Sequence, residues 1–173
     1  MEVLFKTQHG SKLYGLDTPE SDDDWFTVVS KKGVTTSHTR KRYARQSIVD
    51  GVDSTVVDFS TWLAGCLKGV PQYLEAMYSQ SPEFDQIEDF RNSFVVTHMV
   101  YETYFRTIKS FALQEGYKHK RHALRLALNL QEIGRWGRFN PTLSLSDREY
   151  ISDMANKSHE DVYGLALCMA YDV

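Results

Sequence analysis

Cysteine is scarce in this chain, which has only Cys66 and Cys168 among its 173 residues. The two stand far apart among apolar neighbours, so they predict buried free thiols of a reducing compartment rather than a disulfide framework or a zinc site. No apolar run is long enough to span a bilayer, and the N-terminus lacks the pattern of a signal peptide. We therefore expect a cytoplasmic protein, in the host cytoplasm if the gene is viral.

An excess of positive charge is also missing, since the formal net charge is −3. The charge of the whole chain therefore does not favour a nucleic-acid binder. The one dense basic cluster, Arg40–Arg45, predicts either a contact with RNA or the solvated tip of a hairpin. No Walker motif and no Ser/His/Asp or Cys/His arrangement is visible. With 42% hydrophobic residues, the length suits one compact domain, or a small domain with a helical extension.

Hydrophobic periodicity predicts a small sheet followed by helices. Short β-prone runs occupy residues 3–5, 25–29 and 54–58. Helical spacing or caps predict helices over 60–69, 71–78, 93–115, 120–133 and 161–171, with a further helix opened by a capping box of Ser146 and Glu149. We predict an α/β (α+β) fold, with a mixed-sheet core over residues 1–92 and a helical C-terminal region over 93–173.

Residues 9–25 place a glycine–serine turn, a short loop and an acidic cluster between two apolar runs. Gly10 and Ser11 offer backbone N–H groups and a hydroxyl to phosphate oxygens. Asp22 and Asp24 are two residues apart, so on a strand their side chains point to the same face. Two such carboxylates repel unless a cation separates them, and Mg²⁺ takes one or two carboxylates together with substrate phosphates. The run therefore predicts metal-dependent nucleotide chemistry.

A third carboxylate is expected beside this pair. Asp58 ends the last predicted strand, and in a small mixed sheet it would lie near Asp22 and Asp24, so that three carboxylates could hold two metals. Asp53 follows Gly51 as a turn residue and is the alternative if Asp58 points away. The competing interpretation is an exposed acidic turn, because most charge runs are solvated. The glycine–serine turn and the flanking apolar runs favour the metal site.

The chain resembles a known family in these residues: Gly10-Ser11, Tyr14-Gly15-Leu16, Thr18-Pro19, Ser21-Asp22 and Asp24. They are similar to the opening motif of polymerase-β-type nucleotidyltransferases, in the branch that includes the predicted nucleotidyltransferases of bacterial RNA-repair operons. The similarity continues at Asp58, in residues 74–79, and more weakly in a Lys-x-x-His-x-x-Arg-like helix over residues 120–126. It is specific in the opening motif and loose beyond residue 79.

The resemblance implies an enzyme that transfers NMP from an NTP to a hydroxyl and releases pyrophosphate. Gly10 and Ser11 would bind the phosphates, and Asp22 and Asp24 would bind Mg²⁺ or Mn²⁺. Asp58 would complete the second metal site and help to activate the acceptor. His122 and Arg125 share one helix face, where they would contact phosphates or form an ordinary solvated surface.

Two other functions remain open. One is a non-catalytic nucleotide-binding or interaction module on the same fold, although three retained carboxylates argue against it. The other is a nucleic-acid-binding protein that uses Arg40–Arg45. The acceptor is equally open, since RNA, a small hydroxylated molecule or a protein side chain would all supply a hydroxyl.

Overall fold

The computed structural model describes residues 1–30, 43–49, 52–79 and 87–173. A four-stranded mixed sheet lies at the N-terminal end, in the order β1-β2-β4-β3. Strand β2 runs parallel to β4, and the other two pairings are antiparallel. The strands are β1 (Glu2–His9), β2 (Asp23–Ser30), β3 (Ala44–Val49) and β4 (Val52–Asp58).

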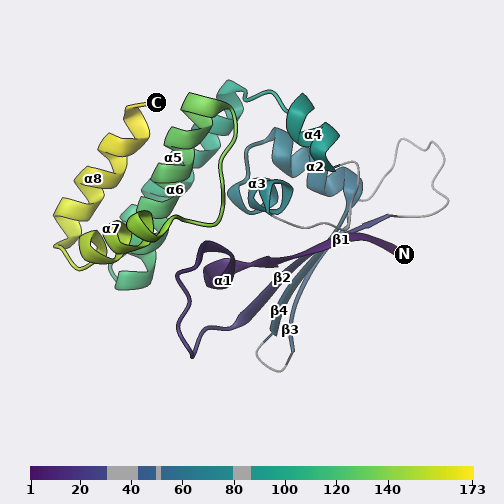
Figure 1. Cartoon of the computed structure of the whole chain (residues 1–173), viewed down its shortest axis with the longest axis horizontal. Helices are drawn as coiled ribbons and strands as arrows, with labels where there is room; N and C mark the ends of the chain where they lie inside the picture. The colour runs from purple at the N-terminus through teal and green to yellow at the C-terminus, as the bar shows by residue number, and fades with distance from the viewer. Residues whose placement is uncertain (31–42, 50–51, 80–86) are drawn as a thin grey trace.

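The helices lie together on one side of the sheet (Figure 1). They are α1 (Gly10–Tyr14), α2 (Phe59–Leu67), α3 (Pro71–Tyr78), α4 (Ile87–Ser93), α5 (His98–Ala112), α6 (Tyr117–Trp136), α7 (Leu145–Ala155) and α8 (His159–Tyr171). Helices α5, α6 and α8 pack side by side beyond the sheet. The predicted α+β class with a helical C-terminal part is confirmed, whereas the division at residue 93 stays a prediction.

One face of the sheet is buried against helices, and side chains two residues apart on a strand share a face. Phe5, Phe26 and Val28 are fully buried on the face that the helices cover. The ring of Trp62 on α2 packs edge-on against Phe5, with 5.2 Å between centroids. Tyr73 on α3 packs in the same way against Phe26, at 5.4 Å. Helices α2 and α3 therefore anchor this face of the sheet.

Three elements differ from the predictions. Strand β3 was not expected, because it is an edge strand without an apolar pattern and forms only by pairing with β4. The helix predicted over 93–115 is shorter, since α5 runs from His98 to Ala112 and Ser93 is the last residue of a separate helix, α4. Helix α7 is capped by Ser144, whose hydroxyl accepts from the Asp147 N–H. The capping box predicted at Ser146 is therefore wrong.

Two further expectations concern the burial of the cysteines and the absence of a membrane-spanning segment. Both thiols are free, but only Cys66 is buried, whereas Cys168 lies on the outer face of α8. The expectation that both are buried is therefore wrong for Cys168. Within the described ranges, none of the helices combines the length and the apolar character that crossing a bilayer requires.

Candidate active site

Strand register brings one histidine and two carboxylates into a row. His9 pairs with Asp24 across β1 and β2, and Asp24 pairs with Asp53 across β2 and β4. Paired residues on neighbouring strands project to the same face of a sheet. Burial, together with the negative charges of Asp53 and Asp22, raises the pKa of the Asp24 carboxyl above its ordinary value. Asp22 thus lies within electrostatic reach, although it precedes β2 and is exposed.

Gly10 lies directly against this carboxylate row. Its φ is +67°, which a side chain rarely tolerates. A Cβ placed on Gly10 would stand 1.9 Å from the Oδ2 of Asp24. The glycine turn between β1 and α1 therefore lies directly against Asp24, as the sequence predicted.

Two cavities meet at Asp24 and Gly10. The first, which we call the polar cavity, has a volume of about 330 Å³ and is lined by residues that include Ser11, Asp22, Lys118 and Arg121. The second, which we call the aromatic cavity, has a volume of about 380 Å³. Its lining includes Tyr14, Asp53, Gln72, Thr107 and Phe111. His122 and Tyr14 contribute to both cavities. The predicted phosphate and metal residues Gly10, Ser11, Asp22 and Asp24 thus share the polar cavity.

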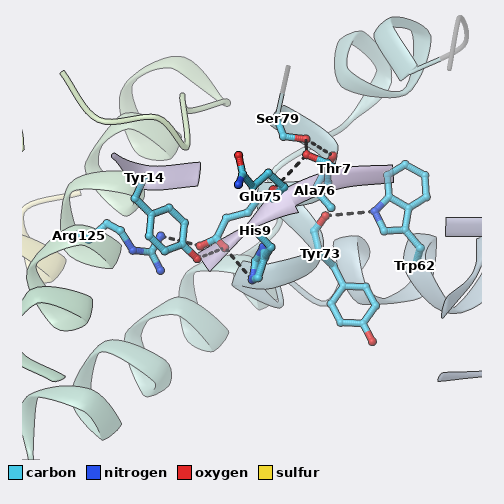
Figure 2. A network of polar contacts seen from close by, with 10 residues as sticks. Thr7, His9, Tyr14, Trp62, Tyr73, Glu75, Ala76, Ser79 and Arg125 are labelled. Carbon is cyan, nitrogen blue, oxygen red and sulfur yellow. Dashed lines mark hydrogen bonds and ion pairs between the residues drawn. The ribbon is translucent and has the colours of Figure 1, made fainter. Parts of the chain in front are cut away.

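A buried carboxylate connects three helices at the site (Figure 2). Glu75 on α3 is 1% exposed. It accepts hydrogen bonds from the Tyr14 hydroxyl at 2.7 Å and from Nη1 of Arg125 at 2.6 Å. The Nε2 of His9 lies 3.7 Å from the same carboxylate. Although burial raises the pKa of Glu75, the Arg125 charge beside it brings the net change below the ordinary value. Helices α1, α3 and α6 are therefore joined by a charged pair.

Arg125 forms this buried ion pair and does not lie on an exposed helix surface. Its guanidinium is buried, pairs with Glu75 and lies 3.6 Å above the ring centroid of Tyr14. The residue lines the aromatic cavity but not the polar one. The expectation of a solvated helix surface is therefore wrong for Arg125, whereas its contact with a phosphate stays a prediction.

His122 does reach the site. Burial, and then the charge of Arg125, lower its pKa to about 4, so the ring is neutral at pH 7. Its ring stands nearly perpendicular to that of Tyr14, with 6.4 Å between centroids, and is tilted by 30° from that of Phe111, at 5.1 Å. A phosphate contact by His122 stays a prediction, in which a neutral ring would donate a hydrogen bond rather than supply a charge.

Asp58 lies at the wrong end of β4 for a metal site. It pairs with Val29, five residues along β4 from Asp53, which separates them by about 17 Å of extended strand. Its carboxylate caps α2 by accepting from the Thr61 N–H at 2.8 Å, and it also accepts from the Tyr43 N–H at 2.7 Å. Although burial raises the pKa of Asp58, these bonds and one from Ser60 lower it to about 2. The expectation that Asp58 joins Asp22 and Asp24 is wrong.

Asp53 occupies the place that was expected for Asp58. Sequence reasoning kept it only as an alternative, because it sits near a glycine turn and the register of β4 on β2 was unknown. The cations Lys118 and Arg121 were not selected either. Lys118 is four residues before His122, so the two share a helix face, whereas Lys120 turns away and donates to the carbonyl of Lys157 at 2.6 Å.

The donor set fits a hard divalent cation that is shared with a substrate. Asp24 and Asp53 are adjacent like charges, and Oδ1 of Asp53 is buried without a hydrogen-bond partner. Within the described ranges no group of three or more His, Cys, Asp and Glu side chains has the arrangement of a complete metal site. Mg²⁺ does not need one, since it takes one or two carboxylates and completes its shell with phosphate oxygens and water.

The basic cluster at Arg40–Arg45 contributes little to this picture. Residues 40–42 lie outside the described ranges, and Arg45 is an exposed residue of edge strand β3. Its predicted contact with RNA therefore stays a prediction.

Comparison with known proteins bears on the opening motif and the sheet together. No curated protein matches the chain by sequence. The family model RlaP, described as the RNA repair pathway DNA polymerase beta family, matches residues 1–158. That range contains the glycine turn, all three strands of the carboxylate row and the helix that carries Lys118 and His122. The chain belongs to the RNA repair pathway DNA polymerase beta family.

Proposed function

We propose that the protein is a metal-dependent nucleotidyltransferase that transfers NMP from an NTP to a hydroxyl acceptor. The observation that carries the proposal is the in-register pair of Asp24 and Asp53, with Gly10 packed against Asp24. A carboxylate pair that faces a glycine turn is the arrangement that phosphoryl chemistry needs, because a cation can then bridge protein and triphosphate. Membership of the family supports a nucleotidyltransferase-like role.

The residues of the polar cavity would position the triphosphate. Gly10 allows backbone approach, and the hydroxyl of Ser11 donates to a phosphate oxygen. Lys118 and Arg121, which line the same cavity, would supply positive charge to the phosphates. Arg121 is held in place by a bond from its Nη2 to the carbonyl of Leu16, and its Nε has no partner within the described structure. A phosphate oxygen would satisfy that buried donor.

The carboxylates would hold the metal. Asp24 and Asp53, with Asp22 at the rim, are the ligands that the geometry favours for Mg²⁺ or Mn²⁺. A cation bound by these carboxylates would supply positive charge to the reacting phosphate and so lower the barrier to attack by a hydroxyl. Tyr14 and Glu75 would keep the glycine turn in register with these ligands, since they tie α1 to α3.

The step itself is a single displacement. A bond forms between the acceptor oxygen and the α-phosphorus, and the bond from the α-phosphorus to the oxygen that bridges to the β-phosphate breaks. Pyrophosphate leaves, and the hydroxyl proton passes to solvent water. The protein forms no covalent bond, so catalysis comes from positioning and charge neutralisation.

The test is transfer of label. The purified protein is incubated with each α-labelled NTP, with Mg²⁺ or Mn²⁺, and with RNA, small hydroxylated molecules or proteins as acceptors. We expect covalent label on one acceptor class and stoichiometric pyrophosphate, both abolished by Asp24→Asn. Binding of NTP without transfer to any acceptor would instead indicate a non-catalytic module.

A further inference from the structure

The two cavities at Asp24 differ in the chemistry of their walls. The polar cavity carries Lys118 and Arg121, whereas in the aromatic cavity Arg125 is the one Lys or Arg among the described lining residues. The charge of Arg125 is already paired with buried Glu75. His122 is neutral at pH 7 because its pKa is about 4. A phosphate in the aromatic cavity would therefore meet two carboxylates, Asp24 and Asp53, and one cation, Arg125, whose charge Glu75 already neutralises.

The walls of the aromatic cavity favour a flat, uncharged group. Tyr14, Phe111 and His122 line it, together with Gln72 and with Thr107, whose hydroxyl donates to the carbonyl of Thr103 and keeps its acceptor capacity. Aromatic walls bind planar rings by stacking, and amide and hydroxyl groups bind the ring edges. The volume of about 380 Å³ lies in the range of small-ligand pockets. A phenol ring would leave the amide of Gln72 without an edge partner, whereas a nucleobase offers both donors and acceptors.

Three buried polar atoms of the lining residues have no hydrogen-bond partner within the described structure: Nδ1 of His9, Oδ1 of Asp53 and Nε of Arg125. Buried polar groups normally have hydrogen-bond partners, so an unpartnered one indicates that a ligand, an ion or water binds there. A sugar hydroxyl can donate to one such atom. The first two atoms belong to the ends of β1 and β4, on either side of Asp24, and the third belongs to α6.

The geometry of displacement decides which substrate belongs here. The attacking oxygen and the leaving oxygen stand in line on opposite sides of the phosphorus. If pyrophosphate leaves into the polar cavity, the acceptor hydroxyl approaches from the opposite side of Asp24. Asp53 lines the aromatic cavity and not the polar one, so the aromatic cavity lies on the acceptor side.

We propose that the aromatic cavity is the acceptor site and that it takes an uncharged nucleoside, whose ring stacks beside Phe111 and whose hydroxyl faces Asp53. The inference rests on the proposed nucleotidyl transfer and adds the chemical class of the acceptor group. Any phosphate attached to that nucleoside remains outside the cavity.

The experiment measures binding of four kinds of probe separately by calorimetry, in the presence of Mg²⁺. The probes are the four free ribonucleosides, tyrosine ethyl ester, inorganic triphosphate, and α,β-methylene analogues of the NTPs. The test variant is Phe111→Leu. Its matched control is Phe105→Leu, which removes another half-buried ring of α5 that packs on Tyr171 rather than on the cavity. Gln72→Ala, with Gln114→Ala as control, repeats the test if Phe111→Leu does not fold.

We expect at least one nucleoside to bind the wild type, and Phe111→Leu to weaken it by about 5- to 100-fold, the usual worth of one stacked base. The affinities for triphosphate and for the NTP analogue should not change. Three results would overturn the proposal: no nucleoside binds, the NTP analogue weakens in step with the nucleoside, or tyrosine ethyl ester binds in place of nucleosides. Failure of the NTP analogue and triphosphate to bind the wild type would overturn the proposed function itself, and the acceptor assignment with it.

Discussion

Asp53 and Asp58 lie on the same strand, and the structure predicts opposite consequences for their removal. Asp58→Ala removes the cap of α2. The backbone N–H groups of Thr61 and Tyr43 then lose their hydrogen-bond acceptor. Asp53→Asn keeps the size of the side chain and its contact with Gln46 but removes one charge beside Asp24. The first variant should therefore lose stability and keep transfer, and the second should lose transfer and keep stability.

The magnitude for Asp58 follows from its hydrogen bonds. The pKa is lowered from 3.8 to about 2, which corresponds to about 2.5 kcal/mol of stability as an upper value. Replacing a capping residue by alanine typically costs about 1 kcal/mol. Asp58→Ala should thus lower the free energy of unfolding by about 1–2.5 kcal/mol, or the melting temperature by about 2–10 °C. Because the folded-state pKa of Asp58 lies below its unfolded value, this stabilisation is complete above about pH 4 and is lost as the pH falls toward 2.

The assays are urea unfolding of both variants at pH 7 and pH 3, and transfer of α-labelled NMP at pH 7. Asp53→Asn should change stability by no more than about 0.5 kcal/mol and should lower transfer at least about 100-fold. Asp58→Ala should transfer label at the wild-type rate, measured below its melting temperature. Loss of transfer in Asp58→Ala with an unchanged melt, together with an active Asp53→Asn, would refute the assignment.

Three other variants address the turn, the metal and the buried pair. Gly10→Ala should abolish triphosphate binding, measured by calorimetry. The control Gly137→Ala has a φ of +68° and open space around it, so it should lower the melting temperature through backbone strain and leave binding unchanged. Equal triphosphate binding by both variants would defeat the steric argument. The double variant Asp22→Asn with Asp24→Asn should lose the thermal stabilisation that Mg²⁺ and NTP together give the wild type, and an identical response would make the acidic cluster a surface feature. Glu75→Gln leaves a buried guanidinium on α6 without its counter-charge and should cost about 3–5 kcal/mol in urea unfolding, so an unchanged midpoint would show that the pair is not needed.

What the sequence determined by itself is local. The positions of Gly10, Ser11, Asp22 and Asp24 could be predicted because a glycine turn and an i, i+2 acidic pair depend on neighbouring residues only. Most helices could be predicted for the same reason, since helical hydrogen bonds join residues four apart and the apolar stripe repeats along the chain. Where such local signals compete, as for the serines at the start of α7, the prediction missed the cap by two residues.

Only the tertiary structure decided which distant residues complete the site. The pairing of β4 with β2 selects Asp53 and sends Asp58 to the opposite end of the strand, and register between strands far apart in sequence depends on the whole core rather than on local pattern. The packing that brings α6 to α3 likewise makes Arg125 the buried partner of Glu75, a pairing that the expected phosphate contact and the alternative of a solvated helix surface both left out. The same packing presents Lys118 to the polar cavity. Burial and charge pairing belong to the assembled fold, so no window of sequence could have assigned these roles.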